Sequence, residues 1–211
     1  MTKLKALGLV LVAAAALMGT FGAKTASATE TSLCKKDTTT GGVPICEGLI
    51  HTYPAKTAVR GGLEAETKFT LQNNIGTVEC KESELRFTTE KETGKPLLST
   101  VDVFSFGQCE RKGEEVLITA EKKGKLAIEV IDMPAWTHNG TLTFGGTDIR
   151  VFYKKTGLEC SYAPADSGVL TGGAIATIDL TGNWPIVMPA ACGVGKAKAN
   201  YTIIAPEPLW V

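Results

Sequence analysis

Apolar and polar residues alternate with a period of two residues along most of the chain from Glu66 onward. The alternating rows are Phe69 and Leu71; Leu85 and Phe87; Val116, Ile118 and Ala120; Leu126, Ile128 and Val130; Ile149, Val151 and Tyr153; and Tyr201 and Ile203. Such rows, rich in β-branched and aromatic residues, are typical of strands with one buried face. After the N-terminal segment, no stretch of twelve residues keeps the period of a helix. The sequence therefore predicts an all-β fold.

Glycine-containing turn signals separate these rows, many of them about 11 residues apart, which is the spacing typical of antiparallel sandwiches and barrels. We expect an antiparallel two-sheet β-sandwich, immunoglobulin-like or jelly-roll-like, with a closed β-barrel as the alternative. Lys123-Gly124 and Asn139-Gly140 are the best candidates for hairpin turns, because a type I′ turn needs residues that accept a positive φ.

One predicted strand breaks its own pattern. Val101 and Val103 share one face, whereas Phe104 and Phe106 share the other. Either a β-bulge shifts the phase or both faces are covered, and Gly107, which follows, favours the bulge.

Residues 1–28 have the pattern of a cleavable signal peptide. Lys3 and Lys5 precede an uncharged run, residues 6–21, and Ala26-Ser27-Ala28 supplies small residues before a cleavage point. The run is 16 residues long, shorter than the roughly 20 that a membrane span needs. We therefore expect a secreted or envelope-associated protein that is not inserted in the membrane after cleavage. Residues 29–60 are expected to be irregular, and residues 61–211 to form one domain.

Six cysteines in an exported chain favour disulfide bonds over free thiols. Six cysteines allow fifteen pairings. Pairing of nearest neighbours gives Cys34–Cys46, Cys80–Cys109 and Cys160–Cys192. The chain has no C-x-x-C motif, and its two histidines, His51 and His138, lie far from any pair of cysteines, so no metal site is expected.

Charge argues against nucleic acid as a partner. After loss of residues 1–28, 19 basic and 22 acidic residues remain, a net charge of −3. This balance lacks the basic stripe that binds phosphates. Charges of both signs are interleaved in residues 79–95 and 110–125, which predicts that these strands face water.

Four short segments carry a resemblance to a known group of proteins. They are residues 76–80, 170–178, 201–203 and 208–211, together with the opening of the signal peptide. With these segments the chain resembles a paralogous set of secreted proteins found in actinobacterial genomes. The resemblance implies an exported, β-rich domain with paired cysteines, and it implies no catalytic residues.

We find no arrangement typical of an enzyme, and we expect neither catalysis nor a cofactor. No serine lies in a G-x-S-x-G motif, and a Ser or Cys nucleophile would depend on His51 or His138. The alternative is a secreted polysaccharide hydrolase, which needs two carboxylates at a suitable separation. The carboxylates in or near predicted strands are Asp102, Glu129, Asp132, Asp148 and Asp179.

Trp136 follows Pro134 by two residues, Trp184 directly precedes Pro185, and both tryptophans have two interpretations. They are candidates for a ligand platform on which sugar rings stack, or each fills one end of the core, since a tryptophan buries roughly 150–250 Å². We expect a non-enzymatic binding, adhesion or structural module, with a glycan or a cell-surface protein as its partner. A small-ligand carrier is a further alternative if the fold is a hollow barrel.

Overall fold

The computed structural model describes residues 30–35, 38–40, 43–45, 51–130, 139–165 and 167–211. These residues form β-strands joined by turns, and their one helical element is a 3-10 turn, η1 (Ala190–Cys192). In this part of the chain no helix has the length and apolar character needed to cross a membrane. The expected signal peptide, residues 1–28, lies outside the described residues.

The strands are β1 (Thr31–Ser32), β2 (Thr38–Thr40), β3 (Val43–Ile45), β4 (Ala58–Leu63), β5 (Phe69–Asn73), β6 (Gly76–Thr89), β7 (Thr93–Gly94), β8 (Leu97–Arg111), β9 (Glu114–Lys122), β10 (Lys125–Val130), β11 (Asn139–Gly145), β12 (Asp148–Tyr153), β13 (Leu158–Tyr162), β14 (Ser167–Thr171), β15 (Thr177–Trp184), β16 (Ile186–Met188) and β17 (Gly195–Ala205).

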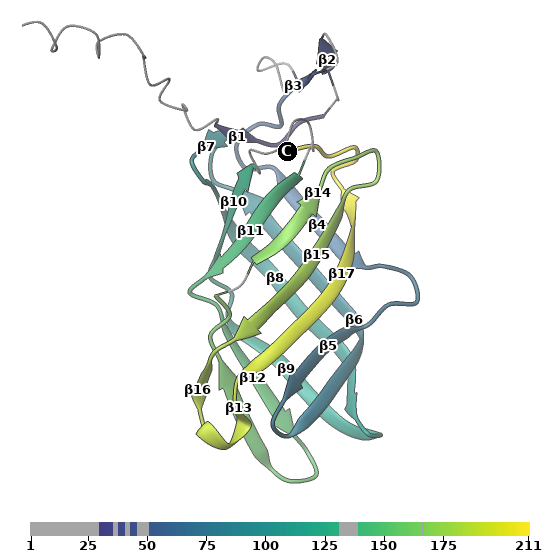
Figure 1. The fold of residues 1–211 in the computed structure, drawn as a ribbon, viewed down its shortest axis with the longest axis vertical. Coiled ribbons are helices and arrows are strands. Elements are labelled where there is room, and N and C mark those ends of the chain that lie inside the picture. The colour runs from purple at the N-terminus through teal and green to yellow at the C-terminus, as the bar shows by residue number, and fades with distance from the viewer. Residues whose placement is uncertain (1–29, 36–37, 41–42, 46–50, 131–138, 166) are drawn as a thin grey trace, which may run out of the picture.

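Thirteen of these strands form one sheet that closes on itself (Figure 1). From β8 the pairing runs through β10, β11, β14, β15, β17, β4 and β6 and returns to β8, so that eight strands make a closed barrel. The predicted antiparallel all-β class is confirmed, and the closed barrel is the one of the two predicted arrangements that the chain adopts. Two small ladders, β1 with β7 and β2 with β3, lie at the end of the barrel where the chain terminates (Figure 1).

The barrel wall has two tiers (Figure 1). Strands β4, β10, β11 and β14 belong to the upper tier of the view, and β5, β9, β12 and β13 to the lower tier. Strands β6, β8 and β17 run through both tiers, and β15 continues as β16 after Pro185. The chain passes directly between tiers from β4 to β5, β9 to β10, β11 to β12 and β13 to β14. The barrel is therefore an up-and-down meander whose long strands are interrupted along their length.

Lys123-Gly124 joins the two tiers, so the prediction of a hairpin turn there was wrong. It connects β9 with β10, and each of these strands pairs with other neighbours. The Thr147 hydroxyl donates to the Lys123 carbonyl at 2.8 Å, which ties this junction to the one between β11 and β12. Gly124 has a φ of 69°. A glycine with a positive φ is compatible with a connection between the two tiers as well as with a hairpin turn.

Asn139-Gly140 is also not a turn, because both residues lie within β11. Gly140 is the partner of Val130 on β10. A Cβ atom at Gly140 would lie 3.0 Å from the Val211 side chain, so the glycine lets the C-terminus approach the wall.

Two-residue turns connect consecutive strands at the lower end of the barrel. Asn74-Ile75 connects β5 with β6, and Lys112-Gly113 connects β8 with β9. Lys112 and Gly113 have φ values of 51° and 77°, and a positive φ at both residues is what a type I′ turn requires.

The predicted bulge in β8 is confirmed. Arg86 on β6 lies opposite Val103, and Phe87 lies opposite Val101, so Asp102 is the additional residue. Val101 and Phe104 are both buried although they are three residues apart, because the insertion shifts the phase of the strand.

Inward-facing side chains of both tiers fill the barrel as one cluster. The largest fully buried members include Trp184, Tyr162, Tyr201, Phe69 and Phe87. The interior of an eight-stranded barrel is just wide enough for side chains to fill it. The interior is therefore a packed core.

The upper end of the barrel is closed by the two ends of the described chain. Leu33, Leu209 and Val211 are buried there. Cys34 and Trp210 exchange two backbone hydrogen bonds, of 2.9 and 3.1 Å. The expected irregular segment, residues 29–60, thus contributes a buried lid, and its last residues begin β4.

The lower end contains a buried polar cluster centred on Asn73. Its side-chain NH₂ group donates to the hydroxyls of Tyr153 and Tyr162, each at 2.8 Å. Its side-chain oxygen accepts from the N–H groups of Ile75 and Gly76. Because the amide is satisfied on both sides, these polar groups are buried without loss of hydrogen bonds.

Two disulfides join neighbouring segments of the wall. Cys80–Cys109 links partner positions on β6 and β8, and Cys160–Cys192 links β13 to η1. Both are among the pairs expected from the sequence. Cys34 is also disulfide-bonded, and Cys46, its expected partner, lies outside the described residues.

Replacing Cys80 and Cys109 together by alanine should lower the free energy of unfolding. The bond closes a loop with a sequence separation of 29, and a loop of this size contributes about 3–4 kcal/mol in the chain-entropy model. Urea unfolding followed by circular dichroism measures the difference. An unchanged unfolding midpoint in the double variant would contradict this expectation.

Candidate functional site

The wall of the barrel opens where residues 64–68 leave it. Strand β6 pairs with β5 up to Cys80 and with β4 from Glu84 onward. Lys81, Glu82 and Ser83 therefore have no partner residue in the ladder on that side. The segments that connect β9 with β10 and β11 with β12 are shorter than residues 64–68. The segment between β13 and β14 is closer to them in length.

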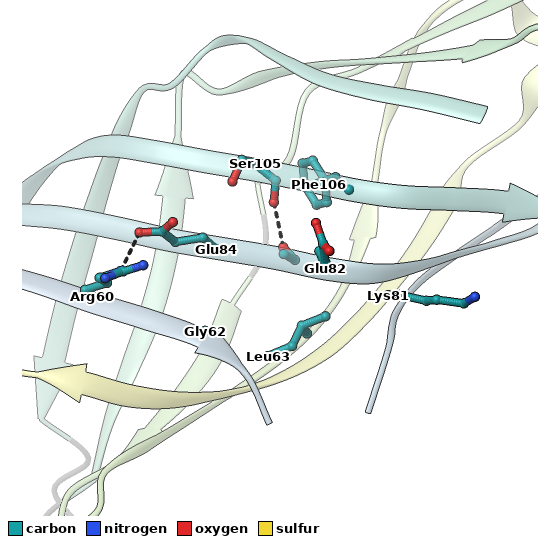
Figure 2. A pocket seen from close by; sticks show the side chains of 10 residues that line it. Arg60, Gly62, Leu63, Lys81, Glu82, Glu84, Ser105 and Phe106 are labelled. Carbon is teal, nitrogen blue, oxygen red and sulfur yellow. Dashed lines mark hydrogen bonds and ion pairs between the residues drawn. The ribbon is translucent and has the colours of Figure 1, made fainter. Parts of the chain in front are cut away.

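A groove of about 400 Å³ occupies this opening (Figure 2). We call it the β4–β6 groove. Its lining residues come from the end of β4, the middle of β6 and the facing part of β8: Arg60, Gly62, Leu63, Lys81, Glu82, Ser83, Glu84, Ser105, Phe106 and Gly107. Its volume lies within the range of roughly 300–1,000 Å³ that is usual for small-molecule sites.

Arg60 and Glu84 form an ion pair at one end of the groove (Figure 2). Arg60 Nε donates to Glu84 Oε1 at 2.7 Å, and Arg86 donates to the same oxygen at 2.7 Å. The hydrogen bond from Arg86, together with that from Arg60, holds the pKa of the Glu84 carboxyl below its usual value. Glu84 is therefore a carboxylate at neutral pH, not a proton donor.

Glu82 and Lys81 lie on β6 beside the unpaired part of the wall. The Glu82 side chain lies across Gly107, where a Cβ atom would come within 2.6 Å of its carboxylate. Gln108 donates a side-chain hydrogen bond to Glu82 and fixes its orientation. Lys81 is exposed and has no ion-pair partner among the described residues.

The hydroxyl of Ser83, a lining residue of the groove, is hydrogen-bonded to two neighbours, of which Tyr201 is buried in the core and does not line the groove. Ser83 Oγ lies 2.9 Å from the Ser105 carbonyl, to which it donates, and 2.8 Å from the Tyr201 hydroxyl. Because Ser83 has one proton to donate, Tyr201 donates to Ser83. Burial raises the pKa of the Tyr201 hydroxyl well above its usual value. Tyr201 thus keeps its proton and does not activate Ser83 as a nucleophile.

The groove also has an apolar side, formed by Phe106 and Leu63. Both side chains are half-buried and pack against the core. The Phe106 ring lies 4.6 Å from that of Phe69 and 4.7 Å from that of Phe104, so its position is set by aromatic neighbours inside the barrel.

Trp184 does not form a ligand platform, and this prediction was wrong. Its side chain is 1% exposed. It lies inside the barrel with ring centroids 5.6 Å from Phe69, 6.3 Å from Phe104 and 6.4 Å from Tyr162. Trp184 fills the core, the other interpretation of the sequence, because its large apolar surface is better removed from water. Trp136, the second predicted platform residue, lies outside the described residues.

The carboxylates considered for a hydrolase are spread over the wall. Asp102 is the bulge residue of β8, Glu129 lies on β10, Asp148 on β12 and Asp179 on β15. No two of these described residues are partners in a ladder. Asp132 lies outside the described residues. The structure therefore does not bring this set together.

Within the described ranges, no group of three or more His, Cys, Asp or Glu side chains is placed to hold a metal ion. Cys34, Cys80, Cys109, Cys160 and Cys192 are all in disulfides. The groove brings together charged side chains, hydroxyl-bearing residues and an aromatic ring on strands of the wall.

Sequence analysis did not single out the residues of the β4–β6 groove. The interleaved charges of residues 79–95 predicted exposed strands, and Glu82 and Glu84 are among them. The groove depends on residues 64–68 leaving the wall, and the local signal for this is weak: Gly61-Gly62 followed by polar residues.

Comparisons with protein-family models, with curated proteins and with solved structures found no match to this chain.

The buried tyrosines should make stability depend on alkaline pH. Burial raises the pKa of Tyr162 to about 12 and that of Tyr201 further, whereas an unfolded tyrosine has a pKa of about 10. Their contribution is complete below pH 10 and is lost as the pH rises from about 10 through 12 and beyond. Urea unfolding between neutral pH and pH 11.5 measures the fall, and a Tyr162→Phe, Tyr201→Phe variant should show a shallower one. Equal slopes for the variant and the wild type would contradict this assignment.

Proposed function

We propose that this chain is an exported, non-enzymatic binding module and that it binds a saccharide in the β4–β6 groove. The observation that carries the proposal is the composition of the groove. Two cations, two carboxylates and two hydroxyl-bearing residues surround an aromatic ring on the wall of a disulfide-linked barrel.

Export is supported by the N-terminal sequence and by the disulfides. Residues 1–28 have the features of a cleavable signal peptide. The two disulfides are compatible with an extracellular protein, since such bonds persist in oxidising compartments. The resemblance to secreted actinobacterial proteins agrees with the same location, in the medium or at the cell envelope.

A saccharide suits the groove because a sugar has polar groups around the edge of its ring and apolar ring faces. Arg60 and Lys81 supply donors, Glu82 and Glu84 supply acceptors, and these four charges sum to zero. Phe106 supplies a half-buried ring that is held in place by its neighbours. Few, well-placed polar groups around an apolar surface are typical of small-ligand sites.

A binding role is better supported than hydrolysis at this site. Glycoside hydrolysis needs one carboxylic acid that keeps its proton near neutral pH. Glu84 is shifted in the opposite direction by Arg86 and Arg60. Ser83 accepts a hydrogen bond from a tyrosine that keeps its proton, which leaves the serine without a base.

The small-ligand carrier, which needs a hollow interior, is less well supported. Trp184, Tyr162 and Tyr201 are each at most 1% exposed inside the barrel and belong to one continuous cluster. A ligand in that space would have to displace packed side chains, which costs several kcal/mol for each large residue (roughly 3–5 by analogy with core truncation).

Filling the groove should abolish binding without harming the fold. A Cβ atom at Gly62 meets no atom within 4 Å, so Gly62→Leu places a side chain into the groove at little cost. We expect the mature wild type to bind members of an oligosaccharide array that includes neutral and acidic glycans. The Gly62→Leu variant should lose at least about tenfold in affinity, a difference of about 1.4 kcal/mol.

Gly145→Leu is the matched control. Gly145 lies on the outer face of β11, and a Cβ atom there also meets nothing within 4 Å. This variant should bind like the wild type. Binding that survives Gly62→Leu would remove the groove as the site, and a wild type that binds no glycan on the array would overturn the proposed function.

A further inference from the structure

We propose that the β4–β6 groove selects saccharides that carry a carboxylate, and that Arg60 binds this carboxylate through its two terminal nitrogens. This inference rests on the proposed function and names the class of saccharide. It comes from an imbalance of charge at one end of the groove.

Arg60 and Arg86 are directly opposite each other on β4 and β6. Like charges in opposite positions of a ladder destabilise the pair unless anions balance them. Among the described residues, Glu84 is the carboxylate that contacts both arginines, through the same oxygen, at 2.7 Å from each. One negative charge thus faces two positive charges, and a second anion would complete the set.

Both arginines also have N–H groups without a hydrogen-bond acceptor among the described residues. Arg60 uses Nε for Glu84, and its terminal nitrogens have no partner in the described part of the chain. Arg86 uses one terminal nitrogen for Glu84, and its Nε is buried without a partner. The Arg60 side chain is 49% exposed, so a ligand in the groove can reach its terminal nitrogens.

Of the other two arginines, Arg150 faces two carboxylates, whereas Arg111 shares Glu114 with Lys155 and its Nε is buried without a partner among the residues described. Arg150 lies 3.4 Å from Glu121 and 3.2 Å from Glu159. Arg111 donates to Glu114 and to the Ile75 carbonyl. Glu114 therefore also serves two cations, but neither it nor its partners line the β4–β6 groove, whereas Arg60 and Glu84 do.

A guanidinium group suits a carboxylate because its parallel N–H groups match the two carboxylate oxygens. With a carboxylate on Arg60, the sugar ring would extend along the groove towards Phe106 and the exposed Ser105. Lys81, which has no ion-pair partner among the described residues, adds a second positive charge at the rim. Acidic sugars such as uronic or sialic acids combine these features, whereas neutral sugars lack the carboxylate.

Isothermal titration with two acidic probes and their neutral esters tests this inference. The probes are tri-galacturonic acid and sialyl-lactose, each compared with its own methyl ester, which keeps the rings and removes the charge. The wild type should bind at least one acid about tenfold or more tightly than its ester, the amount that a charged hydrogen bond contributes. Added salt should reduce this preference, because Arg60 is half exposed.

Arg60→Lys keeps the positive charge and removes the parallel donors. It should reduce the affinity for the acid by about tenfold and leave that for the ester unchanged. The Arg60 side chain is 49% exposed and its lysine replacement keeps the charge beside Glu84, so the variant should keep its unfolding temperature within a few degrees. Arg150→Lys, at a site with two carboxylates of its own, should change neither affinity.

The outcomes separate this inference from the proposed function. Equal affinity for acid and ester, with binding blocked by Gly62→Leu, would overturn the carboxylate preference and leave a saccharide site. Equal loss of acid and ester binding in Arg60→Lys would also overturn it. Binding of neither the acids nor the esters, nor of any glycan on the array, would overturn both.

Discussion

The structure depends on the antiparallel pairing of the last long strand with the first. Strand β17 pairs with β15 on one side and with β4 and then β5 on the other. This pairing joins residues more than a hundred positions apart and closes the meander into a barrel, which leaves the ring of long strands without a free edge. Closure also defines an interior, into which the alternate side chains of every strand project. The packed core, the buried tyrosines and the lid at the upper end all follow from it.

The same closure explains why the groove lies where it does. A closed wall gives each interior residue a backbone partner on both sides, except where the chain leaves the wall. Residues 64–68 leave it between β4 and β5, next to the strand pair that completes the ring. There the side-chain hydroxyls of Ser83 and Tyr201 hydrogen-bond to each other, and the half-buried residue Phe106 lines the opening. An interruption of the ladder thus becomes a site with polar and apolar groups in fixed positions.

The charges outside the barrel fall into two kinds. Arg150 with Glu121 and Glu159, and Lys154 with Glu115, are matched pairs on a solvated wall, which contribute little to stability. In the second kind two cations share one carboxylate, as Arg111 and Lys155 share Glu114 and as Arg60 and Arg86 share Glu84; the Arg60–Glu84–Arg86 set lies beside the β4–β6 groove. We propose that a ligand carboxylate supplies the remaining anion of this set.

The sequence by itself determined the class of fold and several local features. The two-residue alternation predicted antiparallel strands, the break between Val103 and Phe104 predicted the bulge, and neighbouring cysteines indicated two bonds that the structure contains. The sequence did not predict that the sheet closes into a ring, because the alternation indicates which face of a strand is buried and not which strands are neighbours. The same limit applies to Lys123-Gly124, whose positive φ suits either a hairpin or a crossing. Trp184 and the Arg60–Glu84–Arg86 set belong to tertiary structure alone, since burial and charge balance depend on side chains brought together from distant strands.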